Sequence, residues 1–167
     1  MALATPRTWV VGEVVTAAQL NAEIRDQWND LIAPWVAFTP TWGSTGTAPA
    51  LGNGGIVGWH KDIGKTCHAL WEITFGTTTT FGTGTYSWTM PHTAKNPTGS
   101  TTTLNYLGSA RGHGADWYAG TVGVARGTNL ARIYSHKEAT EWSPTIPVTW
   151  TAASSRYISG EVTFEIA

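Results

Sequence analysis

The stretch KTCHALWEITFG (65–76) decides the fold, because its side chains fall into two alternating sets. Successive side chains of a β-strand point to opposite faces of the sheet. Here one face would carry His68, Leu70, Glu72 and Thr74, and the other only apolar residues: Cys67, Ala69, Trp71, Ile73 and Phe75. This pattern predicts a strand that is buried on one side.

The same alternation appears in GTYSWTMP (84–91) and RYISGEVTFEIA (156–167). Gly-, Pro- and Asn-rich pieces such as GSTGTAPALGNGG (43–55) and GTTTTFGTG (76–84) separate the strands. Short strands between such turns indicate an antiparallel β-sandwich. The sequence therefore predicts a mainly β, jelly-roll-like body, with weaker strands at 36–42, 55–61, 103–109, 117–125, 130–135 and 146–151.

One segment, VVTAAQLNAEIRDQWNDLIAPW (14–35), has a helical period instead. Thr16 and Gln19 have the spacing of a capping box, in which each side chain bonds the other residue's backbone amide. The helix should end before Pro34, because a proline disfavours the α conformation of the residue before it. We expect two parts: an extended arm and amphipathic α-helix at 1–35, and a β-sandwich body at 36–167.

The apolar residues of this helix recur every three or four positions and form one stripe. An isolated helix of this length is marginal in water, so the stripe must pack on something. Two readings stay open at nearly equal weight: the stripe packs on its own β-body, or it binds another subunit. The second reading also assigns the preceding arm to the interface, and its anchoring residues are Trp9, Val15, Leu20, Ile24, Trp28, Leu31 and Trp35.

Composition excludes several classes of protein. The net charge is −1, whereas a nucleic-acid-binding protein usually has an excess of basic residues. Composition therefore argues against nucleic-acid binding. No apolar run approaches the ~20 residues that cross a membrane. Charged residues are only 13% of the chain, which suggests that partners cover part of the surface.

The sequence contains no recognisable catalytic motif, and we expect no catalytic residues and no cofactor. The five histidines form no short-spaced ligand pair, so we expect no metal site. Cys67 belongs to an apolar strand face, where a thiol is usually inert. No Gly-x-Ser-x-Gly is present, and spacing selects no carboxylate pair from Asp62, Glu72, Asp116, Glu138, Glu141 and Glu161.

The loop RGHGADWY (111–118) combines charged, imidazole and aromatic side chains. We favour an ordinary turn that leads into a strand whose Trp117 is core. The alternative is a glycan contact, in which aromatic rings stack on a sugar and polar neighbours bind its hydroxyls. Its residues would be Arg111, His113, Asp116, Trp117 and Tyr118.

The segment TPRTWVVGEVVTAAQLNAEIRDQWNDL (5–31) resembles the N-terminal segment of small virion proteins of tailed bacteriophages that infect actinobacteria. The resemblance continues, more loosely, through FTPTW (38–42), GNG (52–54), GKTCHALWEITFG (64–76), TTTTFGTGTYSWTMP (77–91) and SGEVTFEIA (159–167). The family implies a non-enzymatic structural role, with a short helix that anchors a β-sandwich head, often in trimers.

From this resemblance we expect a capsid decoration protein, made in the host cytoplasm and located on the virion. Its partners would be two further copies of itself in a homotrimer and the major capsid protein. The alternative is a tail-fibre or tail-tip protein that contacts tail proteins and binds a host surface glycan. Neither role involves nucleic acid or a membrane.

Overall fold

A computed structural model describes residues 7–99 and 105–167. Within them, nine strands form one antiparallel sheet in the order β1-β3-β4-β9-β6-β7-β8-β5-β2. The strands are β1 (Val36–Phe38), β2 (Trp42–Ser44), β3 (Gly55–Ile63), β4 (Thr66–Thr74), β5 (Tyr86–Thr89), β6 (Asn105–His113), β7 (Trp117–Ala125), β8 (Leu130–Ser135) and β9 (Tyr157–Glu165).

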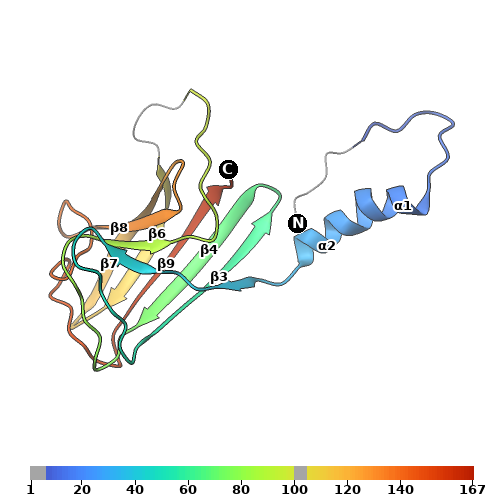
Figure 1. The fold of residues 1–167 in the computed structure, drawn as a ribbon. Helices are drawn as coiled ribbons and strands as arrows, with labels where there is room; N and C mark the ends of the chain where they lie inside the picture. Colours follow the sequence, from blue (N-terminus) through green and yellow to red (C-terminus); the bar gives the residue numbers. More distant parts are fainter. Residues whose placement is uncertain (1–6, 100–104) are drawn as a thin grey trace.

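The sheet curls over a shared core, as a sandwich or half-barrel does (Figure 1). The two halves meet through aromatic side chains: the rings of Trp71 on β4 and Trp88 on β5 are 6.1 Å apart, and Trp42 on β2 stacks on Phe75 at 5.9 Å. The predicted mainly β, sandwich-like fold is therefore confirmed.

Strand β4 has the predicted two faces. Cys67, Ala69, Trp71 and Ile73 are each at most 1% exposed. Residue Gly64 allows the tight β3–β4 hairpin, because it begins a two-residue turn with a φ of 59°, and glycine adopts positive φ without a steric penalty. This hairpin places β3 beside β4 over the full length of both strands.

Two weaker strand predictions need correction. Residues 146–151 form no strand; Ile146 makes only an isolated bridge to Ser143, although Trp150 is buried. Pro144 lies in the turn that this bridge closes and Pro147 follows it, and proline cannot donate a backbone hydrogen bond to a ladder. The predicted strand at 36–42 is split into β1 and β2 around Pro40.

The other four weak strands are present: β7 and β8 have the predicted bounds, and β3 and β6 have shifted ends. Strand β3 runs two residues beyond the predicted Lys61, and β6 continues to His113. Residues 103 and 104 of the predicted strand at 103–109 lie outside the described residues.

The helix forms as predicted and consists of α1 (Ala17–Leu20), η1 (Asn21–Arg25) and α2 (Asp26–Ile32). The capping box is present: the Gln19 amide donates to Thr16 Oγ1 (3.3 Å), and the Thr16 amide donates to Gln19 Oε1 (2.7 Å). The helix ends at Ile32, and its C-cap Ala33 directly precedes Pro34. Its middle turn, η1, is π-helical, a rare form that is frequent at functional sites.

Gly160 provides a test of the core. It pairs with Trp71 across β9 and β4, and a Cβ added to it would lie 2.5 Å from Trp71 Cζ2. We expect Gly160→Ala to lower the free energy of unfolding by about 1–3 kcal/mol, because the ring must move within a filled core. Thermal denaturation measures this loss. The control is Ser159→Ala, because Ser159 is the preceding residue of β9 and lies on the outer face of the sheet. Equal melting temperatures for the two variants would contradict this account of the core.

Candidate functional site

Lys61 of β3 ties the helix to the body. Its Nζ donates to the carbonyl oxygens of Asp30 (2.7 Å) and Ala33 (2.6 Å). The last carbonyls of a helix have no partner within the helix, and the helix dipole makes this end negative. A lysine ammonium donates hydrogen bonds to these carbonyls, and its positive charge complements the negative end of the helix. It fixes the C-terminal end of the helix beside the sheet, while the rest of the helix extends away from the body (Figure 1).

The apolar stripe of the helix is not covered by the body. No residue of α1, η1 or α2 is buried. Trp28 is 62% exposed, and the other predicted anchoring residues are between 44% and 48% exposed: Trp9, Val15, Leu20, Ile24, Leu31 and Trp35. Trp35, which follows the helix, contacts His68 of β4 with ring centres 5.4 Å apart, but the stripe residues within the helix are not covered. The reading in which the helical stripe packs on its own β-body is therefore wrong. Monomeric proteins seldom expose a continuous apolar surface of this kind.

The described part of the arm folds back beside the helix. A turn at Val11 and Gly12 reverses the chain, and Gly12 has a φ of 84°. The guanidinium of Arg7 then lies 2.7 Å from Glu13 and 3.6 Å from Glu23 in η1. Arg7 also covers one face of Trp9, at 5.0 Å from its ring centre. Trp9 is thus held on the same unit as the stripe.

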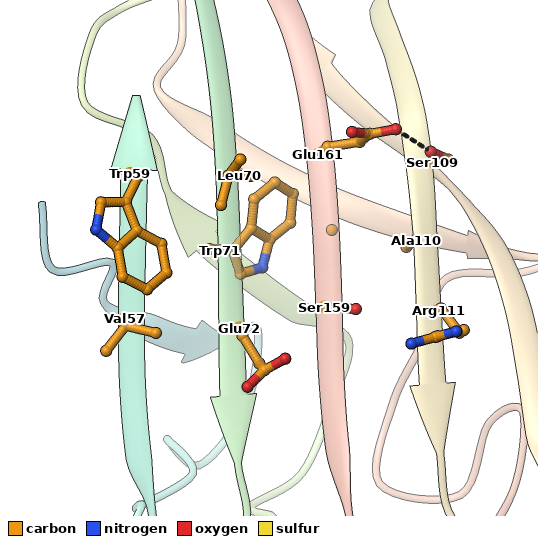
Figure 2. A pocket seen from close by; sticks show the side chains of 11 residues that line it. Val57, Trp59, Leu70, Trp71, Glu72, Ser109, Ala110, Arg111, Ser159 and Glu161 are labelled. Carbon is orange, nitrogen blue, oxygen red and sulfur yellow. Dashed lines mark hydrogen bonds between the residues drawn. The ribbon is translucent and has the colours of Figure 1, made fainter. Parts of the chain in front are cut away.

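A second exposed surface is a shallow groove of about 550 Å³ on the outer face of β3, β4, β9 and β6 (Figure 2). Trp59 and Val57 on β3 are 40% and 45% exposed. The groove also contains carboxylates, and Glu161 accepts a hydrogen bond from Ser109 Oγ (2.8 Å). Aromatic and polar groups that line one open sheet face can bind an extended polar ligand or the face of another subunit.

The RGHGADWY loop is arranged differently from the prediction. Arg111 and His113 belong to the end of β6, and Trp117 is 56% exposed, so the prediction that Trp117 is core is wrong. The Arg111 guanidinium lies 4.6 Å from the Trp117 ring centre, and the His113 ring lies 4.5 Å from it. Tyr157 of β9 completes this cluster: Arg111 donates to its hydroxyl at 2.8 Å.

Two residues of the predicted glycan contact are not in the cluster. Asp116 accepts from the Trp117 amide (2.8 Å) and shapes the turn. Tyr118 is half-buried against Trp150, with ring centres 6.2 Å apart, because neighbouring strand residues point to opposite faces. Tyr157 could have been found only from the pairing of β6 with β9, which sets His113 beside Tyr157.

Sequence analysis missed a third cluster, formed by His60, Asp62, Cys67 and His92. The hairpin register places Asp62 opposite Cys67, and His60 lies two residues before Asp62 on the same face of β3. A two-residue turn at Gly64 and Lys65 is therefore enough to bring His60, Asp62 and Cys67 together. His92 comes from the loop after β5, and no spacing in the sequence brings it here.

Burial and hydrogen bonding perturb the acidic groups of this cluster. Burial raises the pKa of the Asp62 carboxyl, but hydrogen bonds from His60, His92 and Cys67 outweigh it and leave the pKa below its usual value. Burial, with a smaller effect from Asp62, raises the pKa of the Cys67 thiol. The thiol is therefore protonated at neutral pH and is a poor nucleophile.

Comparisons of this chain with protein-family models, with curated proteins and with solved structures found no match. The resemblance described from the sequence therefore stays a hypothesis. Among the described residues, no helix has the length and apolar character that crossing a membrane requires.

The tie between helix and sheet is testable through Lys61→Met, which keeps the length of the side chain but removes its donors. We expect amide hydrogen exchange in α2 to become faster, because the carbonyls of Asp30 and Ala33 lose their partner. Exchange in the core strands should not change. Lys65→Met, at the tip of the same hairpin, is the control. Unchanged exchange in α2 after Lys61→Met would contradict a structural role for this contact.

Proposed function

We propose that this protein is a structural protein of a tailed-phage virion, and that it forms a homotrimer through its N-terminal helix. The observation that carries the proposal is the apolar stripe, which lies outside the β-body and is about half exposed along its length. The resemblance of residues 5–31 to phage virion proteins supports the same conclusion.

We propose that the stripe packs against the same stripe of two further copies of the protein. Leu20, Ile24, Trp28 and Leu31, all within the helix, follow one another at spacings of four, four and three residues, which is typical of the seam of a helical bundle. A buried Leu, Ile or Trp side chain contributes about 1.5–3 kcal/mol. Completing the burial of half-exposed side chains would thus contribute about 1 kcal/mol for each residue of each copy.

Cyclic symmetry suits this arrangement, because a three-fold axis buries identical surfaces without leaving an open end. The helix is about 24 Å long, and β1 begins shortly after it, at Val36. Each body is therefore carried close to the bundle. We propose that the compact trimer decorates the capsid exterior and contacts the major capsid protein.

The bundle is tested by Trp28→Ala, with Arg25→Ala as the matched control on the polar face. Trp28 contributes an indole to the stripe, whereas Arg25 makes an exposed ion pair with Asp26 of its own helix (2.8 Å). Such pairs contribute little to stability. We expect Trp28→Ala to raise the concentration at which the trimer dissociates by about tenfold or more, and Arg25→Ala to leave it almost unchanged. Light scattering after size exclusion measures the mass; a monomeric wild-type protein would contradict the proposal.

A second candidate function is favoured by one observation, the cluster of Arg111, His113, Trp117 and Tyr157. A tail-tip protein that binds a host glycan would present such a surface, because exposed rings stack on sugars and a guanidinium binds hydroxyls. The two roles differ in copy number. A decoration protein is present in hundreds of copies per particle and a tail-tip protein in few, so quantitative mass spectrometry of purified particles separates them.

The glycan role is tested by retention on host cell-wall polysaccharide. If it holds, Trp117→Ala should abolish retention, because the ring supplies the stacking surface. The control is Trp9→Ala, which removes another exposed indole from the arm. Retention that is absent from the wild-type protein, or equal in Trp117→Ala, would contradict the glycan role.

A further inference from the structure

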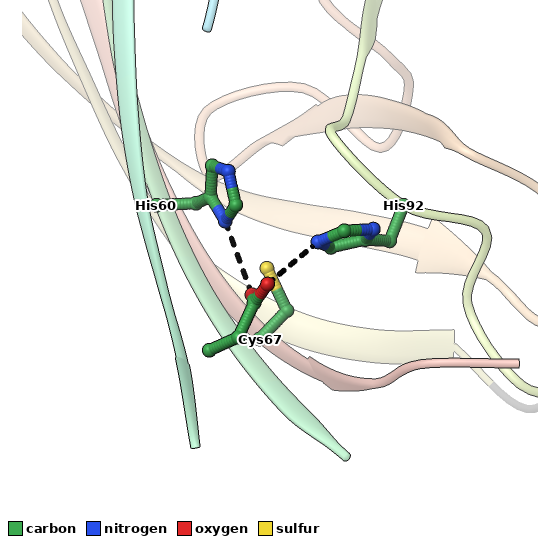
Figure 3. Close-up of side chains that lie close together, drawn as sticks. His60, Cys67 and His92 are labelled. Carbon is green, nitrogen blue, oxygen red and sulfur yellow. Dashed lines mark hydrogen bonds and ion pairs between the residues drawn. The ribbon is translucent and has the colours of Figure 1, made fainter. Parts of the chain in front are cut away.

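Four side chains of metal-ligating type meet at the end of the β3–β4 hairpin (Figure 3). His60 and Asp62 come from β3, Cys67 from β4, and His92 from the loop after β5. Asp62 lies between the two imidazoles: its Oδ1 is 3.1 Å from His60 Nδ1, and its Oδ2 is 2.8 Å from His92 Nε2. One ligand atom of each residue lies within 4.8 Å of all the others.

We propose that His60, Asp62, Cys67 and His92 bind one zinc ion in a closed, structural site. Two imidazoles, a thiolate and a carboxylate are ligands that Zn²⁺ accepts. A thiolate disfavours Mg²⁺ and Ca²⁺, which require oxygen ligands. Four protein ligands fill the tetrahedral coordination of zinc and leave no open position for a substrate.

The dimensions of the cluster fit this ion. Zinc bonds of about 2.0–2.3 Å place tetrahedral ligand atoms roughly 3.3–3.8 Å apart. The distances from Asp62 to the two imidazole nitrogens, 3.1 and 2.8 Å, are slightly shorter, and no two ligand atoms are more than 4.8 Å apart, so small side-chain rotations complete the tetrahedron. The rings of His60 and His92 are already nearly perpendicular, at 85°, with centres 5.1 Å apart.

Burial also matches a metal site. Cys67 is fully buried and His60 is 8% exposed, whereas the side chains of Asp62 and His92 are 23% and 32% exposed. The centre is thus shielded on the core side and open to solvent on the other, which gives the ion an entry path. A hydrogen-bonded network of Asp62 with the two imidazoles would not need a thiol. The Cys67 sulfur nevertheless lies in the same group of ligand atoms, as a metal site requires.

Binding would release one proton. Cys67 loses its thiol proton to solvent as the thiolate bonds the metal, which outweighs the effect of burial on its pKa. An imidazole binds zinc through an unprotonated nitrogen and carries its proton on the other one, so a proton that faces Asp62 would move to the far nitrogen of the same ring. Asp62 is already ionised at neutral pH and exchanges its hydrogen bonds for a metal bond.

The ion would join three elements: β3, β4 and the loop after β5. It links the turn end of the β3–β4 hairpin, where Asp62 pairs with Cys67, to the loop after β5. Lys61, between His60 and Asp62 in the sequence, holds the helix from the opposite face of β3. A metal on the inner face of β3 would therefore stiffen the strand to which the helix is attached.

The experiment uses the full-length protein, treated with a chelator and then titrated with Zn²⁺. We expect one ion per chain, about one proton released per ion, and a melting temperature raised by about 5–10 °C when free zinc is a hundred times the dissociation constant. Titration with Co²⁺ should give tetrahedral visible bands and a near-ultraviolet thiolate-to-metal band.

The variants separate this site from adventitious binding. His92→Ala removes a ligand from a partly exposed loop, where the fold should tolerate it, and Cys67→Ser removes the thiolate at nearly constant volume. Each should weaken zinc affinity by more than the 10–100-fold that loss of an outer-shell partner typically costs. Cys67→Ser should also abolish the thiolate band of Co²⁺. The control is His136→Ala, whose imidazole bonds Thr121 elsewhere in the body.

Three results would overturn the proposal: no saturable binding at one ion per chain, affinity that His92→Ala leaves unchanged, or a Co²⁺ spectrum without a thiolate band. None of them bears on self-association, since the stripe and this cluster share no residue. The zinc experiment and the measurement of oligomeric state therefore test two independent proposals.

Discussion

The packing of Trp71 against the opposite half of the curled sheet is the contact on which the body depends. Its indole fills the space that Gly160 leaves on the neighbouring strand and reaches Trp88 on the far side of the core. Trp42, Trp142 and Trp150 extend the same aromatic layer. Because this layer closes the sheet on itself, the body needs nothing from the helix to bury its apolar residues, and the stripe is left for another surface.

Half of the ten tryptophans are buried in the core, and half are exposed on the surface. Five are in the core, and five are at least 40% exposed: Trp9, Trp28, Trp35, Trp59 and Trp117. The exposed five lie on the arm, on and just after the helix, on the outer sheet face and in the Arg111 cluster. Apolar residues that face water in a chain with few charges indicate surfaces that function in contact with something else.

The sequence predicted well the elements whose pattern is local. Strict alternation identified β4, β5 and β9, and the Thr16 box and Pro34 fixed the ends of the helix, because caps and strand periods depend on neighbouring residues alone. It failed at Trp150, where burial comes from a loop rather than a strand, and at Trp117, whose exposure depends on how β6 and β7 pair. His92 reaches Asp62 only through the curl of the sheet, which no local pattern encodes.

The sheet begins and ends with its shortest strands. Its edges, β1 and β2, are three residues long each, so they offer few free backbone groups to a neighbouring molecule. Strand addition at β1 or β2 would gain only a few hydrogen bonds. Short edge strands thus limit the pairing of neighbouring β-bodies edge to edge.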